Sequence, residues 1–159
     1  MRNVLIFGNS SSGKSTLAKK LHKEHGLAHL DLDLLAWLPT TPPTRKPLEE
    51  SRVEIEAFIS SNALWVIEGC YADLLEFAAP ASEEIIFMNL PIDTCLDNAK
   101  RRPWEPHKYP SKEAQDANLD MLLKWISQYE ERTDSFSKTM HQQFFDRYQK
   151  SKAMINHNP

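Results

Sequence analysis

Two of the four glycines in this 159-residue chain stand five positions apart, and they frame the segment that most restricts the possible folds. Residues Gly8–Ser15 read G-N-S-S-S-G-K-S, which matches the phosphate-binding loop pattern of ATP- and GTP-using enzymes. An apolar run at residues 3–7 precedes the loop, as in a buried strand, and residues 14–25 repeat apolar side chains on one helical face. This order places backbone N–H groups at a helix N-terminus, where the helix dipole adds positive potential.

The motif assigns roles to particular side chains. Lys14 is expected to reach the β- and γ-phosphates, and the Ser15 hydroxyl is expected to ligate Mg²⁺. ATP and Mg²⁺ are therefore the predicted cofactors. The predicted nucleotide-binding residues of the loop are Gly8, Asn9, Ser10, Ser11, Ser12, Gly13, Lys14, Ser15 and Thr16. A chance match in a turn is the alternative, and the flanking strand and helix patterns argue against it.

Composition and charge limit the classes of protein to which the chain can belong. Its length predicts one domain, spanning residues 1–159, that can bury a sizeable core. The formal net charge of −3 gives no overall attraction to DNA, RNA or anionic lipid. We interpret Cys70 and Cys95 as buried thiols in a reducing compartment. Since no segment resembles a signal peptide or a membrane span, a soluble cytoplasmic protein is expected.

Strand-like and helix-like segments alternate along the chain, which predicts an α/β fold with a parallel sheet. The expected strands are residues 3–7, 28–32, 64–67, 84–88 and 152–155. The expected helices are residues 14–25, 48–60, 93 to about 101, a long helix around 119–126, and a helix marked by aromatic and Met residues within 136–148.

Two proline-rich segments interrupt this alternation. Four prolines in residues 39–47 are incompatible with regular structure, and three prolines in residues 103–110 indicate a second loop. Long loops in compact domains are often lids or binding loops, and plain surface loops are the alternative. We therefore predict a substrate-side loop at about 38–47 and a lid loop at about 102–112.

The size, an Asp-x-Asp segment and the two loops resemble the small-molecule P-loop kinases, such as adenylate kinase, shikimate kinase and gluconate kinase. The guanine-reading Asn-Lys-x-Asp motif of regulatory GTPases is absent from the sequence. Residues His29–Trp37 and Trp65–Tyr71 more closely resemble the bacterial adenylate-kinase-related family of topology modulation proteins. The resemblance covers Met1 to about Arg102. It implies a P-loop NTPase fold with a five-stranded parallel sheet, order 2-3-1-4-5, and helices on both faces. The family's name records a genetic effect on DNA topology and establishes no reaction.

Asp31 and Asp33 follow the second expected strand, at the edge where open α/β sheets bind ligands. Because they stand two residues apart on an extended chain, their side chains are expected to point the same way. The resemblance to shikimate kinase implies that Asp33 holds the acceptor hydroxyl and can take its proton, whereas Asp31 lies nearer the metal. The alternative for Asp33 is a helix N-cap.

Three residues at the end of the third expected strand are further candidates. Glu68 resembles the acidic residue that helps hold Mg²⁺ through water in nucleoside monophosphate kinases. A lone buried carboxylate is costly, so Glu68 needs a partner, for which Mg²⁺ or Lys14 would serve; a structural salt bridge is the alternative. Gly69 would let a substrate approach the backbone closely, and Tyr71 could contact substrate or pack. The predicted metal ligands are Ser15, Asp31 and Glu68, and the six histidines show no metal-ligand spacing.

Arginines supply the remaining candidates. Arg101 and Arg102 resemble the start of the mobile lid of shikimate kinase, whose arginine closes on the transferring phosphate. This makes Arg102 a catalytic candidate and Arg101 a nucleotide-binding one, with a basic helix end as the alternative. Asn98 stands where the topology modulation family often has another arginine. Arg52 and Arg132 resemble positions that clamp an acidic substrate group, and the alternative is that they are ordinary surface arginines.

Two functions from different classes are compatible with these residues. The leading hypothesis is ATP- and Mg²⁺-dependent phosphoryl transfer to a small-molecule acceptor, in which catalysis is mostly positioning and electrostatics. The alternative is a nucleotide-dependent regulatory ATPase that affects DNA topology through a macromolecular partner. There, Lys100, Arg101, Arg102 and Lys108 would contact DNA phosphates, although four cations in a chain of net charge −3 make a weak footprint. A third possibility is a nucleotide-binding protein without turnover.

Overall fold

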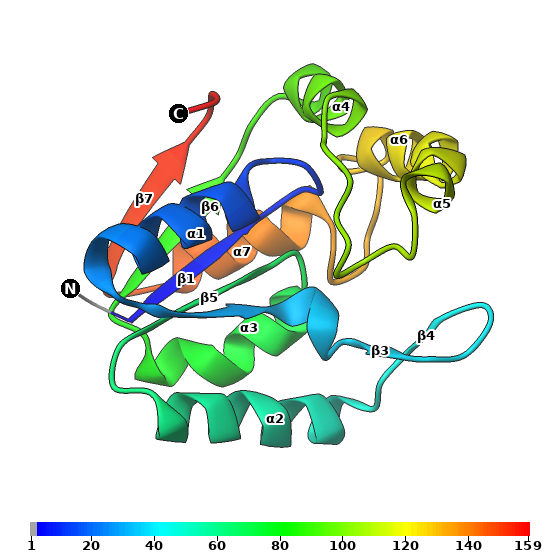
Figure 1. Cartoon of the computed structure of the whole chain (residues 1–159). Coiled ribbons are helices and arrows are strands. Elements are labelled where there is room, and N and C mark those ends of the chain that lie inside the picture. The colour runs from blue at the N-terminus through cyan, green and yellow to red at the C-terminus, as the bar shows by residue number, and fades with distance from the viewer. Residues whose placement is uncertain (1–2) are drawn as a thin grey trace.

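A parallel sheet forms the centre of the protein, with helices on both of its faces (Figure 1). The structure is a computed structural model that describes residues 3–159; Met1 and Arg2, where the predicted domain and the family resemblance begin, lie outside the described residues. The strands of the sheet are β1 (Val4–Gly8), β2 (Ala28–Asp31), β5 (Trp65–Gly69), β6 (Glu84–Met88) and β7 (Ser151–Ile155). Within residues 3–159 these five strands follow the order β2-β5-β1-β6-β7, and neighbouring strands are parallel. The predicted α/β fold is confirmed.

The numbers of the main-sheet strands skip from β2 to β5, because a small hairpin that was not expected from the sequence supplies β3 and β4. β3 (Trp37–Leu38) pairs antiparallel with β4 (Thr44–Arg45), away from the main sheet. Counted along the chain without this hairpin, the main-sheet order reads 2-3-1-4-5. The expectation that residues 39–47 lack regular structure was therefore wrong. The four prolines lie between the paired strands or after them, so they remove no N–H group from the ladder.

The helices divide between two hydrophobic cores, one on each face of the sheet. They are α1 (Lys14–His25), α2 (Leu48–Ser61), α3 (Ala72–Ala78), α4 (Ile92–Lys100), α5 (Lys112–Ala117), α6 (Leu119–Ser127) and α7 (Lys138–Arg147). Helices α1, α4 and α6 contribute to the core that contains Val4 and Ile6, whereas α2, α3 and α7 contribute to the core that contains Leu5 and Phe7. Successive residues of β1 thus serve opposite faces, and the strand is buried throughout because both faces are covered.

Two helical predictions need correction. Helix α3 was not predicted, because seven residues are too few to show a clear helical period. The expected long helix around 119–126 is one of two short helices, α5 and α6, which meet at Asn118. Of the two thiols expected to be buried, Cys95 is buried and Cys70 is half-buried. Among residues 3–159, no helix is long and apolar enough to cross a membrane.

Candidate functional site

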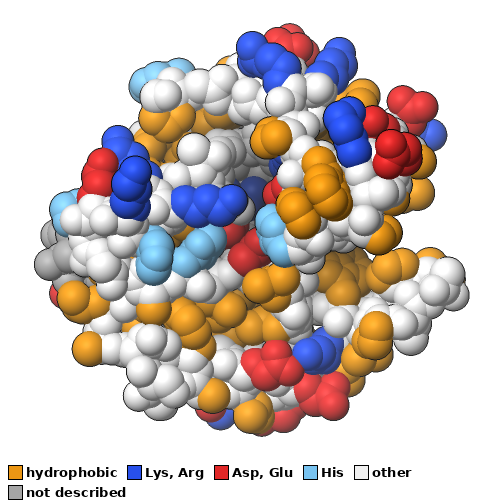
Figure 2. Space-filling view, viewed as in Figure 1, with side chains coloured by type: hydrophobic (Ala, Val, Ile, Leu, Met, Phe, Trp, Pro, Cys, Tyr) orange, Lys and Arg blue, Asp and Glu red, His pale blue; other side chains and the backbone are white. Residues whose placement is uncertain are grey.

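The phosphate loop lies between β1 and α1 and borders a cleft of about 810 Å³. Figure 2 shows this face of the molecule hollowed near its centre. Gly8 is required where the loop leaves the strand, because a Cβ there would lie 2.4 Å from the backbone oxygen of Met88 and φ is +150°. The Lys14 ammonium group donates a 2.6 Å hydrogen bond to the Asn9 carbonyl, so the lysine bends back over the loop. The Asn9 side chain in turn donates to the Ile126 carbonyl, which ties the loop to α6.

Oxygen atoms that suit Mg²⁺ gather where α1 begins and β5 ends. The Ser15 hydroxyl donates a 2.7 Å hydrogen bond to Glu68 Oε2. Asp31 is the register partner of Glu68 on the adjacent strand β2, and both residues are buried. Hydroxyl and carboxylate oxygens are the donors that Mg²⁺ prefers, and Mg²⁺ usually takes only one or two carboxylates beside substrate phosphates. Among residues 3–159, no three or more His, Cys, Asp or Glu side chains form a self-contained metal site.

Glu68 has a second partner that sequence reasoning missed. His29 Nε2 lies 3.1 Å from Glu68 Oε2, the oxygen that also accepts from Ser15. Lys14 was the residue expected to pair with Glu68, and neither Ser15 nor His29 was predicted as its hydrogen-bond partner. Lys14 instead contacts the loop carbonyl of Asn9. The available signal was strand alternation, because His29 stands two residues before Asp31 and side chains two apart share a face of β2.

Asp31 and Asp33 converge, although for a different reason from the one expected. The chain after Asp31 turns into a 3₁₀ helix, η1 (Leu32–Leu34), so the segment is not extended. Asp31 is the N-cap of this turn and accepts a 2.9 Å hydrogen bond from the Asp33 N–H, so the alternative of an N-cap applies to Asp31 and not to Asp33. Lys108 joins the two carboxylates, with Nζ 2.8 Å from Asp33 Oδ2 and 3.5 Å from Asp31 Oδ2.

The two aspartates have opposite pKa shifts. Burial, together with the charges of Glu68 and Asp33, raises the pKa of Asp31 above its ordinary value. Burial also acts to raise the pKa of Asp33, but the ion pair and hydrogen bond with Lys108 outweigh it and hold that pKa below its ordinary value. Asp33 is therefore the carboxylate that stays ionised most readily. Such divergent pairs are typical of sites with distinct acid–base roles.

Tyr71 and Trp37 hold Asp33 from the other side. The Tyr71 hydroxyl donates to Asp33 Oδ1 and accepts a 2.8 Å hydrogen bond from the Trp37 indole N–H. Trp37 stands on the hairpin, so this contact connects the substrate-side loop to the aspartate. Gly69 has a packing role that was not expected. A Cβ there would lie 2.9 Å from the Leu32 side chain, and Gly69 also lines the cleft, so a close approach of substrate to its backbone stays a prediction.

The segment predicted to be a lid lies along the same cleft. Arg102 Nη2 donates a 2.5 Å hydrogen bond to the hydroxyl of Ser11 in the phosphate loop, and Nη1 donates to Glu105 at 3.1 Å. Asn98 donates a 3.0 Å hydrogen bond to the Ser11 carbonyl, so it also contacts the loop. Arg101 lines the cleft. The residues after α4 therefore reach both the phosphate loop and, through Lys108, the aspartates.

Two predicted clamp residues are not brought into the cleft. Arg52 lies on the exposed side of α2 and pairs with Glu49 and Glu56. Arg132 pairs with Asp134, and its guanidinium carbon lies 3.4 Å from the centroid of a Trp125 ring.

An arginine near Tyr71 does exist, and sequence reasoning did not select it. Arg45, on β4, pairs with Asp73, and its guanidinium lies 5.1 Å from the centroid of the Tyr71 ring. The missed hairpin explains the omission, because pairing with Trp37 is what places Arg45 there.

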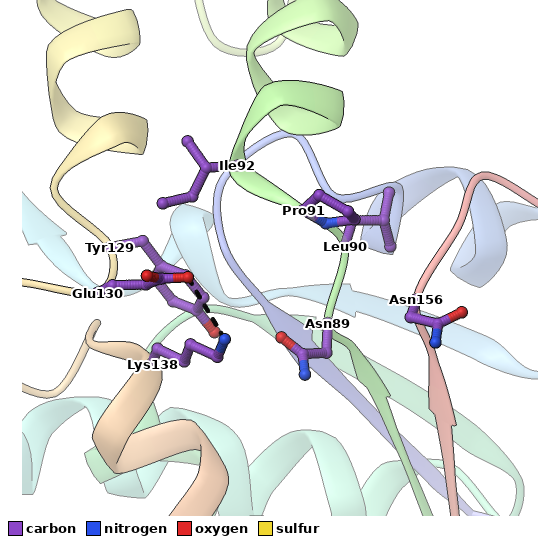
Figure 3. A pocket seen from close by; sticks show the side chains of 8 residues that line it. All are labelled: Asn89, Leu90, Pro91, Ile92, Tyr129, Glu130, Lys138 and Asn156. Atoms are coloured by element: carbon purple, nitrogen blue, oxygen red, sulfur yellow. Dashed lines mark hydrogen bonds and ion pairs between the residues drawn. The ribbon is translucent and has the colours of Figure 1, made fainter.

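A second, smaller pocket of about 250 Å³ lies at the ends of β6 and β7 (Figure 3). The side chains that line it belong to Asn89, Leu90, Pro91, Ile92, Tyr129, Glu130, Lys138 and Asn156. Its charged groups, Glu130 and Lys138, form an ion pair with each other at 3.4 Å. None of these residues belongs to the phosphate loop, whereas Lys14, Ser15 and Asp33 line the larger cleft.

The chain is similar in sequence to a protein of Bacillus subtilis. No protein-family model matches the chain. The uncharacterized protein YqaC of Bacillus subtilis (strain 168) is 25% identical over 131 residues, which cover 81% of this chain and 73% of that protein.

Solved structures of kinases share the fold. Shikimate kinase from Acinetobacter baumannii, in complex with shikimate, superposes with a TM-score of 0.57 at 15% identity, covering all of this chain and 85% of that one. Shikimate kinase from Bacteroides thetaiotaomicron gives 0.55 at 15% identity, with 97% and 85% covered. A sugar kinase from Janibacter sp. HTCC2649 gives 0.50 at 13% identity, with 80% and 95% covered. The chain therefore has the P-loop kinase fold, and at these identities the likeness concerns fold alone.

Proposed function

We propose that the chain is a cytoplasmic ATP- and Mg²⁺-dependent phosphotransferase that acts on a small-molecule acceptor, in the manner of shikimate or nucleoside monophosphate kinases. The observation that carries the proposal is that Lys14 of the phosphate loop and Asp33 border the same cleft. One cleft with phosphate-binding groups and a carboxylate that follows a different strand can hold a donor and an acceptor together. Positioning of this kind supplies much of the catalysis in phosphoryl transfer.

The nucleotide half of the cleft is built from the loop and the metal ligands. Backbone N–H groups of Gly8–Thr16 and the Lys14 ammonium group would hold the phosphates. Ser15, Asp31 and Glu68 would hold Mg²⁺, directly or through water. When bound, Mg²⁺ would neutralise charge on the phosphate oxygens. Arg101 would line the nucleotide.

The acceptor half is centred on Asp33. Its ionised carboxylate would accept a hydrogen bond from the acceptor hydroxyl and orient the oxygen for attack. Tyr71 holds the carboxylate in place. Because its pKa is held below the ordinary value, Asp33 is better suited to orienting the hydroxyl than to taking its proton early. Arg102 would compensate charge on the transferring phosphoryl group. The contacts of Arg52 give it no part in this arrangement.

The regulatory alternative has less support. It needs a basic surface for DNA, yet two of the four candidate cations, Arg102 and Lys108, pair with Glu105 and Asp33 inside the cleft. Membership of the topology modulation family remains our proposal. It rests on the segments His29–Trp37 and Trp65–Tyr71, which supply the aspartates, Glu68 and Tyr71.

A thermal-shift screen of nucleotides and metabolites, followed by an ADP-release assay with the compounds that bind, tests the proposal. Saturation with Mg²⁺-ADP at about 100 times Kd should add about 2.7 kcal/mol, or about 5–11 °C in Tm at this chain length. Lys14→Ala should abolish that shift, whereas Lys23→Ala, at the far end of α1, should retain it. An equal shift in the Lys14 variant would reject the loop assignment. ATP turnover that no hydroxyl-bearing compound stimulates would favour the regulatory alternative.

A further inference from the structure

The lid carries two cations that contact opposite halves of the cleft. Arg102 reaches the phosphate loop through the Ser11 hydroxyl at 2.5 Å. Lys108, six residues later, reaches Asp33 Oδ2 at 2.8 Å. The two contacts span the places proposed for the nucleotide and for the acceptor. A lid held only at the phosphate loop would cover the donor alone, so the second cation requires an explanation.

Glu105 lies between the two cations and contacts both. Its Oε1 accepts the 3.1 Å hydrogen bond from Arg102, and its Oε2 lies 4.0 Å from the Lys108 ammonium nitrogen. The Lys108 N–H also donates to the Glu105 carbonyl at 3.0 Å, which closes a turn between them. The Glu105 side chain is only 16% exposed, so these charges interact with little screening by water.

The turn is anchored to the helix that follows it. The Glu105 N–H donates a 2.8 Å hydrogen bond to the side-chain oxygen of Gln115 in α5, and the Gln115 amide donates to the Pro103 carbonyl at 3.0 Å. Two backbone groups that lie between Arg102 and Lys108 in the chain are therefore held by one side chain. These bonds restrain the backbone between the two cations, so the distance between Arg102 and Lys108 is restrained by the fold of the lid.

We propose that Lys108 is a positioning residue of the transfer site, held by Glu105 at a set distance from Arg102, so that one closure of the lid orders both halves of the cleft. The inference rests on the proposed phosphotransferase function. Lys108 holds one oxygen of Asp33, and Tyr71 holds the other. The acceptor hydroxyl then meets a carboxylate whose orientation is fixed from both sides, and Arg102 is brought over the phosphates by the same movement.

An ordinary salt bridge would stabilise the lid without affecting the transfer step. The two interpretations differ in what Lys108→Met should do. If Lys108 positions Asp33, the variant should lower kcat for the acceptor by about 10- to 100-fold, because misplaced groups cost about that much, and leave ADP affinity within about threefold. Lys108→Arg keeps the charge and should recover part of kcat. A salt bridge with a stabilising role alone would instead lower Tm and leave kcat in place.

The experiment compares the wild type, Lys108→Met, Lys108→Arg and Glu105→Gln with the control Lys112→Met. Lys112 lies in the same region, but its ion pair with Asp116 is exposed and outside the cleft. Hydrogen exchange of the amides between Trp104 and Tyr109, in free protein and with ADP, reports lid closure without any acceptor. We expect exchange at least about threefold faster in Lys108→Met and Glu105→Gln, and unchanged in Lys112→Met.

Failure of this inference and failure of the proposed function give different results. If the wild type transfers phosphate to an acceptor and Lys108→Met keeps wild-type kcat, only the role of Lys108 is overturned. Unchanged lid exchange in Lys108→Met overturns it as well. If the wild type binds ADP but transfers phosphate to no acceptor, the proposed function is overturned, and the role of Lys108 in transfer falls with it.

Discussion

The hydroxyl of Ser15 donates a 2.7 Å hydrogen bond to the carboxylate of Glu68, a residue 53 positions later in the chain. The two meet because β5 lies beside β1 in the parallel sheet, so the end of β5 faces the start of α1. Two of the predicted magnesium ligands, Ser15 and Glu68, are thus in contact. This contact leads to the first prediction.

Glu68→Gln should weaken the effect of Mg²⁺ on nucleotide binding. The amide keeps the size of the side chain but lacks the negative charge that attracts a divalent cation. The gain in ADP affinity on adding Mg²⁺ should fall by about 10- to 100-fold, measured by calorimetry with Mg²⁺ and with EDTA. Glu76→Gln, at an exposed ion pair with Arg147, is the control. If ADP affinity falls equally in EDTA, Glu68 does not act through Mg²⁺ and serves only to hold the Ser15 hydroxyl.

Asp33→Asn should damage transfer while sparing the nucleotide. We expect ADP affinity within about threefold of wild type and acceptor-dependent transfer lower by about 10²–10⁴, nearer the lower value because kinase transition states are loose. Steady-state kinetics and ADP binding, measured in parallel, check this result. Asp116→Asn, on the exposed side of α5, should change neither quantity. Normal turnover with poor ADP binding would place Asp33 in the metal site instead.

Arg102→Ala should act on kcat far more than on ATP binding. An arginine that meets the phosphoryl group in the transition state can be worth about 10³–10⁵ in rate. Pre-steady-state turnover and ADP titration of the same preparation separate the two effects. Arg52→Ala removes an arginine outside the cleft and should leave both quantities unchanged. Wild-type turnover in the Arg102 variant would mean that Arg102 is only a basic residue at the end of a helix and takes no part in transfer.

His141 should make folding stability depend on pH. Burial lowers its pKa to about 4, below the usual value of about 6.5 in an unfolded chain. Between these values the unfolded state binds more protons, so stability is complete above pH 6.5 and is lost as pH falls toward 4, by up to about 1.4 kcal/mol per pH unit. The free energy of unfolding, measured by denaturant titration at several pH values across this range, should change less steeply with pH in His141→Gln than in wild type. Identical slopes would contradict a neutral buried imidazole.

The phosphate loop and the sheet could be predicted because their signals are local. The loop residues Gly8 to Ser15 are consecutive, and their spacing alone places the backbone N–H groups and Lys14. The apolar runs of β1 and β5 similarly predict strands buried on both faces. The hairpin that pairs Trp37 with Arg45 was missed, because a proline removes a ladder donor only at its own position and neither short strand contains a proline.

The sequence by itself determined the fold class, the phosphate loop and the positions of the acidic residues at the strand ends, because strand and helix periods and loop conformations depend on neighbours a few residues away. Only the tertiary structure decided which charges meet. Lys108 contacts Asp33 across 75 positions, His29 contacts Glu68 across 39, and Arg52 faces away from the cleft. The sequence does not show whether an arginine or lysine side chain faces solvent or a carboxylate. Its partner depends on how distant segments pack, and the energy of the contact depends on the burial that the packing creates.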